Sequence, residues 1–282
     1  MAAAVARGFL PLAGEASIAG VSCRLVGREV PSHHRCMSML QAQSTVLCTI
    51  GMHGSASTWV FNVARELLGA TFGEAQILPF FADRLEHLPD AREQSGLRLI
   101  IKSHEGSDEL EAWLDAGGAQ RILSIRDPRD AVLSLVQRFG MGLNASVGAI
   151  LRDSARVQRL AANGAPVWRY EDRFFDSPES VGRLASQLGL TPPAELQEAI
   201  FQRYRTAAVR EFANSLSTLP ETRLTQVGPF AMDKVTQILG PHIGDGTIGK
   251  WRGLPAQLQL QLNDIFGPFL AQFGYAEAVL PG

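Results

Sequence analysis

Cysteine is scarce in this sequence, and its scarcity excludes a disulfide framework and a cysteine-based metal site. The chain of 282 residues has three cysteines, Cys23, Cys36 and Cys48, an odd number without metal-ligand spacing. Cys48 lies within an apolar run that is typical of a buried strand. We therefore predict reduced thiols, no bound metal and a cytoplasmic location.

Long apolar runs and an excess of charge of one sign are also absent. No stretch approaches the roughly 18 apolar residues of a membrane-spanning helix, so we expect no membrane partner. The 26 Lys and Arg residues nearly balance the 28 Asp and Glu residues, which leaves a net charge of -2. Without a basic field no nucleic acid is expected, and any anion site must be built locally.

What is present is the composition of an ordinary globular protein, with 46% hydrophobic and 19% charged residues. Residues 1–44 begin with an alanine-rich stretch that lacks the apolar core of a targeting signal, and we predict a disordered or loosely docked extension there. Residues 45–282 carry regular patterning to their last amphipathic helix, which predicts a single domain.

Short apolar runs alternate with amphipathic segments along this domain. The runs that predict strands are 46–50, 97–104, 121–126 and 166–170, and helical patterns follow each of them. We interpret 76–81 and 214–228 as loops and 194–212 as helical throughout. The alternation predicts an α/β fold with a central parallel sheet flanked by helices, and polar groups gather at the carboxyl ends of the strands.

The first strand breaks into small and hydroxylated residues over 51–59, immediately before a helix. Free amides and the positive end of the helix dipole suit such a place to phosphate or sulfate, and Ser55, Ser57 and Thr58 add hydroxyl donors. The nucleoside-triphosphate loop needs a Lys before its hydroxyl residue, and here Ala56 precedes Ser57. The pattern therefore indicates an anion site of a different kind.

Five segments, in this chain order, resemble the sulfotransferases that use 3′-phosphoadenosine-5′-phosphosulfate (PAPS). The segment GMHGSASTW (51–59) is similar to the family's 5′-phosphosulfate loop, and IKSH (101–104) matches its K-[T/S]-H element. RDPRDAVLS (126–134) resembles its 3′-phosphate motif, YED (170–172) its Y-E-D segment, and GTIGKW (246–251) the second half of its glycine-rich loop. The resemblance covers about residues 46–275.

The resemblance implies a P-loop-type domain that binds PAPS as donor and moves its sulfuryl group to a hydroxyl or amine of a small-molecule or carbohydrate acceptor. It implies His104 as general base and Lys102 as a contact of the sulfuryl group. Arg126 and Ser134 would bind the 3′-phosphate. The implied donor-binding residues are His53, Gly54, Ser55, Ala56, Ser57, Thr58, Trp59, Arg126, Ser134, Tyr170 and Gly246, with Trp59 and Tyr170 offered to adenine.

The sequence departs from the family at two places in the loop. Gly54 stands where the family has a Lys or Arg, and Ala56 stands where it has Gly. Substitute cations would be Lys102, Lys250, Arg252 or His53. Three hypotheses follow. The protein is an active sulfotransferase, a catalytically weak binding or regulatory relative that holds adenosine 3′,5′-bisphosphate (PAP), or a P-loop small-molecule kinase. The missing Lys before Ser57 argues against the third, and the sequence indicates no oligomeric state.

Overall fold

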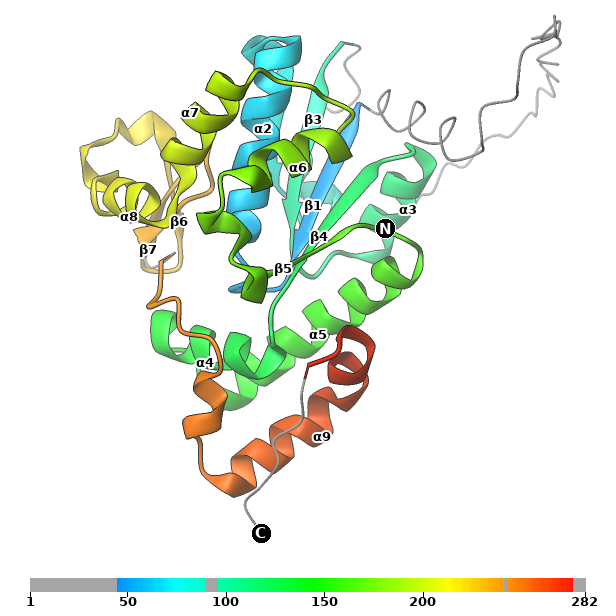
Figure 1. The fold of residues 1–282 in the computed structure, drawn as a ribbon, viewed down its shortest axis with the longest axis vertical. Coiled ribbons are helices and arrows are strands. Elements are labelled where there is room, and N and C mark those ends of the chain that lie inside the picture. Colours follow the sequence, from blue (N-terminus) through cyan, green and yellow to red (C-terminus); the bar gives the residue numbers. More distant parts are fainter. Residues whose placement is uncertain (1–44, 90–95, 241–242, 276–282) are drawn as a thin grey trace, which may run out of the picture.

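A computed structural model describes residues 45–89, 96–240 and 243–275, so the predicted N-terminal extension, Cys23 and Cys36 lie outside the described residues. Its centre is a five-stranded sheet in the order β2-β3-β1-β4-β5, and every pair in it is parallel (Figure 1). The strands are β1 (Val46–Gly51), β2 (Ile77–Phe81), β3 (Arg98–Ser103), β4 (Gln120–Ile125) and β5 (Val167–Arg169). The predicted central parallel sheet is confirmed.

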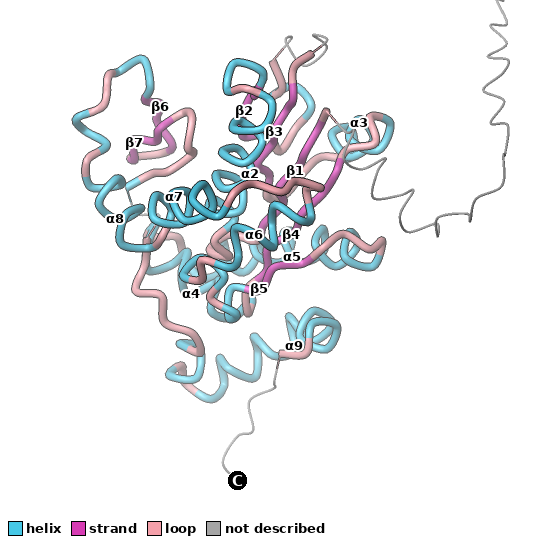
Figure 2. The backbone as a smooth tube through the Cα atoms, turned by 45° about the horizontal axis from the view of Figure 1, so that its top comes forward, coloured by secondary structure: helices cyan, strands magenta, loops and turns pink. Residues whose placement is uncertain are grey.

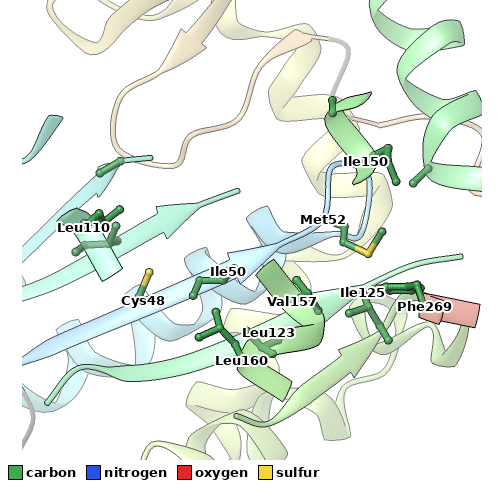
Figure 3. Close-up of a cluster of buried hydrophobic side chains, with 14 of the residues drawn as sticks. Cys48, Ile50, Met52, Leu110, Leu123, Ile125, Ile150, Val157, Leu160 and Phe269 are labelled. Atoms are coloured by element: carbon green, nitrogen blue, oxygen red, sulfur yellow. The ribbon is translucent and has the colours of Figure 1, made fainter. Parts of the chain in front are cut away.

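Strand β1 is buried on both faces, as its unbroken apolar sequence predicts. Its side chains alternate between two hydrophobic clusters, Cys48 and Ile50 on one face of the sheet and Leu47 on the other. Figure 3 shows the first face, where Ile50 lies among side chains of β4 and of a covering helix that includes Val157. Burial raises the pKa of the Cys48 thiol to about 12, which makes it an unreactive core residue.

Helices cover both faces of the sheet, which gives three layers (Figure 2). One face is covered by α3 (Asp108–Ala116), α4 (Pro128–Phe139), α5 (Leu143–Ala162) and α9 (Ala256–Phe273). The other is covered by α2 (Ser57–Phe72), α6 (Glu179–Gln187) and α7 (Ala194–Tyr204). None of the helices in the described ranges combines the length and apolar character that crossing a bilayer requires.

Three local predictions were wrong. Residues 77–81, expected as a loop, form the edge strand β2, a position that tolerates Pro79 because an edge residue can do without its N–H. The helical stretch 194–212 is interrupted at Arg205, whose extended backbone separates α7 from α8 (Thr206–Asn214). The expected loop 214–228 ends in a hairpin of β6 (Leu224–Val227) and β7 (Phe230–Asp233), which lies beside α8 in Figure 1.

The strand order places the ends of β1, β3 and β4 side by side. β1 lies between β3 and β4, with Ile50 level with Ser103 and Gly51 level with Ser124. The loops that leave these strands therefore emerge together at one edge. In open parallel sheets this is the edge where ligands bind.

Candidate functional site

A cavity of about 900 Å³ opens at this edge of the sheet. Every residue predicted for the site lines it except Ser55. Seven basic residues and two acidic ones belong to its described lining, although acids slightly outnumber bases in the whole chain. The basic residues are Lys102, Arg126, Arg138, Arg173, Arg205, Arg210 and Lys250, and the acids are Asp176 and Asp245. This local excess of positive charge suits an anionic ligand.

The loop after β1 is packed tightly beneath the cavity floor. A Cβ at Gly51 would overlap Ser57 and the Ser124 hydroxyl, so this position requires glycine. The Ser55 hydroxyl donates to the Met52 carbonyl at 2.7 Å and shares a hydrogen bond with Ser124 at 2.8 Å. The prediction that Ser55 adds a hydroxyl donor for an anion is therefore wrong, because its side chain is fully buried in bonds that hold the loop.

Helix α2 begins at Ser57 and directs its first turn at the cavity, whose wall includes Ser57 and Thr58. Its N-cap Ala56 has φ 60° and ψ 28° and no capping side chain. The first amides of a helix have no partner within the helix, and they carry the positive end of its dipole. The geometry expected for an anion site is thus present at the place the sequence indicated.

Ala56 lies in the left-handed region, which costs a residue with a Cβ about 1–2 kcal/mol. We expect Ala56→Gly to raise the free energy of unfolding by about 0.5–1 kcal/mol, since glycine removes this strain and loses more entropy on folding. Urea denaturation measures the change. Ala70→Gly, at an exposed position in the same helix, is the matched control and should lower stability by about 0.5–1 kcal/mol. Equal effects of the two substitutions would contradict the strain at Ala56.

His104 is held from three sides at the end of β3. Its Nδ1 lies 2.5 Å from the Gly51 carbonyl oxygen, so Nδ1 carries a proton and Nε2 is the basic nitrogen. The backbone N–H of His104 donates to Asp83 at 2.6 Å, and the Arg156 guanidinium donates to its carbonyl at 3.0 Å. These contacts fix both the tautomer and the position that a general base requires.

Lys102 lies on β3 and is 5% exposed, although it belongs to the cavity wall. Burial and, to a smaller extent, the nearby Arg138 lower the pKa of its ammonium group from 10.5 to about 8, and Asp83 opposes the shift. A lysine with a pKa near 8 holds its proton at neutral pH and loses it in mildly alkaline solution.

His53 stands beside His104 and is bound to a buried carboxylate. Its backbone N–H and its Nδ1 each lie 2.7 Å from one Asp153 oxygen, and the two imidazole rings stack with centroids 4.0 Å apart. Among the described residues His53, His104 and Asp153 form the one group with metal-like spacing. Both Nδ1 atoms already take part in hydrogen bonds, however, and the absence of a metal stays a prediction.

The pKa of His53 reflects two opposing causes. Burial lowers it, and the charge and hydrogen bond of Asp153 together outweigh burial, so the pKa lies above its usual 6.5. The stability that the pair contributes is therefore fully present below about pH 6.5 and is lost as the pH rises through the raised folded value.

We expect Asp153→Asn to cost more free energy of unfolding in mildly acidic than in alkaline buffer. Urea denaturation measures this, with the exposed Asp264→Asn as control, and equal losses in both buffers would contradict it.

Arg126 joins two loops across the cavity. Its Nη2 donates to the Thr247 carbonyl at 2.7 Å, and its Nη1 donates to the Gly54 carbonyl at 3.3 Å. Its guanidinium also lies over the Tyr170 ring, 4.1 Å from the centroid. The glycine-rich segment, Tyr170 and the loop after β1 thus converge on one guanidinium, in agreement with their proximity expected from the sequence.

The acidic residues of the 126–134 segment organise the protein itself. Asp127 caps α4 and binds the Arg129 guanidinium through both carboxylate oxygens. Asp130 accepts hydrogen bonds from the backbone N–H groups of Gly249 at 2.5 Å and Trp251 at 3.0 Å. The glycine-rich segment is therefore fixed to the start of α4.

The remaining predicted residues occupy different surroundings. Gly246 faces the cavity near the Tyr170 hydroxyl. Trp59 packs on Phe174 at a centroid distance of 5.3 Å and on Trp168 at 6.1 Å, within the core cluster beside the cavity. The predicted adenine contacts of Trp59 and Tyr170 stay predictions.

Four residues that hold or line the site were missed by the sequence analysis: Asp83, Arg138, Asp153 and Arg156. Two of them could have been recognised from the sequence pattern. Asp153 interrupts a buried stripe of α5 between Ile150 and Val157, where a carboxylate needs a partner. Arg138 follows Ser134 by one turn of α4 and so shares its face.

Comparison with known proteins identifies the architecture. No known protein-family model and no curated protein matches the sequence. Among solved structures, mouse sulfotransferase SULT7A1 complexed with PAP superposes with a TM-score of 0.59 at 13% identity, covering 82% of this chain and 89% of that one. Retinol dehydratase in complex with androsterone and the inactive cofactor PAP gives a TM-score of 0.52 at 13% identity, covering 87% of each chain. The chain therefore has the fold of the sulfotransferases.

Proposed function

We propose that this protein binds PAPS and transfers its sulfuryl group to the hydroxyl or amine of a small-molecule acceptor. The observation that carries the proposal is the convergence of the α2 N-terminus, Arg126 and His104 on one cavity with an excess of positive charge. A donor with a phosphate and a phosphosulfate needs separate anion contacts. The cavity offers the α2 amides with Lys102 at one place and Arg126 with Ser134 at another.

The residues present fit the chemistry that such a donor supplies, which is a sulfuryl group activated by its bond to phosphate. His104 Nε2 would take the proton of the acceptor as the new bond to sulfur forms. Lys102 would place its charge beside the transferring oxygens, and the amides of Ser57 and Thr58 would receive the phosphate. Transfer of this kind depends mainly on positioning and on charge stabilisation, and this site provides both.

One part of the cavity wall is apolar and suits the body of an acceptor. Phe81 lies beside His104 with ring centroids 5.7 Å apart, and Phe139 contacts Phe230 of the β6–β7 hairpin edge to face at 5.9 Å. Met141 completes this wall of the cavity. These side chains favour a small molecule with an apolar portion over an entirely polar carbohydrate.

The experiment has two arms. Isothermal titration calorimetry with PAP, adenosine 5′-monophosphate and ATP measures whether the 3′-phosphate is recognised. Transfer from radiolabelled PAPS to a panel of phenols, alcohols and amines measures activity. Tight PAP binding with transfer supports the proposal, whereas PAP binding without transfer to any acceptor favours the binding or regulatory protein, a reading motivated by Gly54 in the loop. Preference for ATP over PAP would contradict both readings and favour a kinase.

A further inference from the structure

The backbone of the loop after β1 disfavours a side chain at Gly54. Its φ of +79° is unfavourable for any residue with a Cβ, and a Cβ built there would lie 3.3 Å from the Ser134 hydroxyl. An arginine introduced at this position would therefore be strained. A cation directed at the loop must come from another element of the fold.

Two of the substitute cations suggested by the sequence are committed elsewhere. Lys250 donates to Gln137 at 2.8 Å and pairs with Asp245 at 3.3 Å. Arg252 lies 4.8 Å from the Trp251 ring centroid and does not belong to the cavity lining. Lys102 does line the cavity, and the proposed function already places its charge beside the transferring oxygens.

Arg138 approaches the loop from α4. It lies on α4 one turn after Ser134, and its Nη1 donates to the Ser134 hydroxyl at 3.3 Å. This is the oxygen nearest to a Gly54 Cβ, which would also lie 3.9 Å from Arg126 Nη1, so Arg138 belongs to the group of side chains beside the missing one. A Cβ at Gly244 would lie 3.3 Å from Arg138 Cδ. The absence of a side chain at Gly244 therefore leaves room for Arg138 to extend into the cavity.

The electrostatic surroundings of Arg138 also favour an anion at this place. Burial and, to a smaller extent, the neighbouring charge of Arg126 lower the pKa of its guanidinium to about 10. The two guanidiniums repel each other across a site partly removed from water. An anion bound by Arg138 would lessen this repulsion.

We propose that Arg138 is the residue that contacts the 5′-phosphosulfate end of the donor, in the role that a loop lysine or arginine would otherwise fill; this rests on the proposed function. In transfer, the acceptor oxygen or nitrogen bonds to sulfur and its proton passes to His104 Nε2. The bond from sulfur to the 5′-phosphate oxygen breaks, and its electron pair stays on that oxygen. Arg138 stabilises the charge that develops there.

The test uses three ligands that need no acceptor. The gain in affinity from adenosine 3′-monophosphate to PAP measures the contact with the 5′-phosphate, and the gain from adenosine 5′-monophosphate to PAP measures the contact with the 3′-phosphate. By calorimetry, Arg138→Gln should reduce the 5′ gain by about 10- to 100-fold, the usual worth of a charge-assisted hydrogen bond, and the 3′ gain by a smaller factor, through the Ser134 hydroxyl that Arg138 contacts. Arg126→Gln should do the reverse, and the exposed Arg159→Gln on α5 should change neither.

An unchanged 5′ gain in Arg138→Gln, or a loss confined to the 3′ gain, would overturn the assignment. A parent protein that binds none of the three ligands would instead overturn the proposed function and the assignment with it. Circular dichroism and thermal unfolding verify the fold of each variant. If Arg138→Gln folds poorly, Arg138→Lys carries the test, because a point charge without the guanidinium fork should reduce the 5′ gain several-fold.

Discussion

Replacing His104 with glutamine is expected to slow sulfuryl transfer by about 10²–10⁴-fold while PAP affinity stays near that of the parent. Glutamine can donate a hydrogen bond to the Gly51 carbonyl, as Nδ1 does at 2.5 Å, but it cannot accept the proton of the acceptor. The measurement is single-turnover transfer from radiolabelled PAPS, with PAP affinity determined by calorimetry on the same samples.

The control for this prediction is His87→Gln, at an exposed histidine outside the cavity, which should transfer as fast as the parent. His53→Gln separates the two stacked imidazoles. If it abolishes transfer while His104→Gln transfers at the parental rate, the base is His53, oriented by Asp153, and the assignment of His104 is wrong.

The second large effect is expected at Lys102. Lys102→Met should lower kcat by about 10²–10³-fold, the usual cost of removing one preorganised charge-stabilising group from an active site. Methionine preserves most of the buried stem of the side chain and removes only its charge. Steady-state rates with saturating PAPS provide the measurement, and a kcat equal to that of the parent would exclude Lys102 from the transfer step.

The pKa of Lys102 also predicts how activity depends on pH. Since kcat/KM reports the ionisation of the free enzyme, it should fall as the pH rises through about 8, where Lys102 loses its proton. Lys102→Arg should lack this decline, because arginine stays charged throughout that range. A decline near pH 8 that persists in Lys102→Arg would belong to another group.

The sequence predicted the parts of the fold that local chemistry determines. β1 is a continuous apolar run, and α4 begins where Asp127 caps it and Pro128 occupies its first turn. The strand β2 was missed because Pro79 argues against a strand, and only pairing with β3 at the edge of the sheet makes this segment one. The β6–β7 hairpin was missed for a similar reason, since each strand has only four residues.

The candidate site was predictable where single segments carry it and unpredictable where side chains meet across the fold. Lys102, His104 and Arg126 follow strands whose ends the sheet brings together. The sequence predicts that the Ser55 hydroxyl contacts an anion. In the structure this hydroxyl forms a hydrogen bond with Ser124, because the register of β1 against β4 brings the two side chains together. Arg138 belongs to no motif, and its approach to Ser134 depends on the direction of its side chain along α4.

The attachment of Gly249 and Trp251 to Asp130 has a consequence for biosynthesis. The segment that Arg126 and Asp130 hold is made more than a hundred residues after them, so a nascent chain lacks this part of the proposed nucleotide site until it has been extended past Trp251. Nucleotide bound at the proposed site would then stabilise a chain extended past Trp251 more than a shorter one. Ligand binding would therefore favour completed molecules over truncated ones, by an amount that grows with the logarithm of nucleotide concentration.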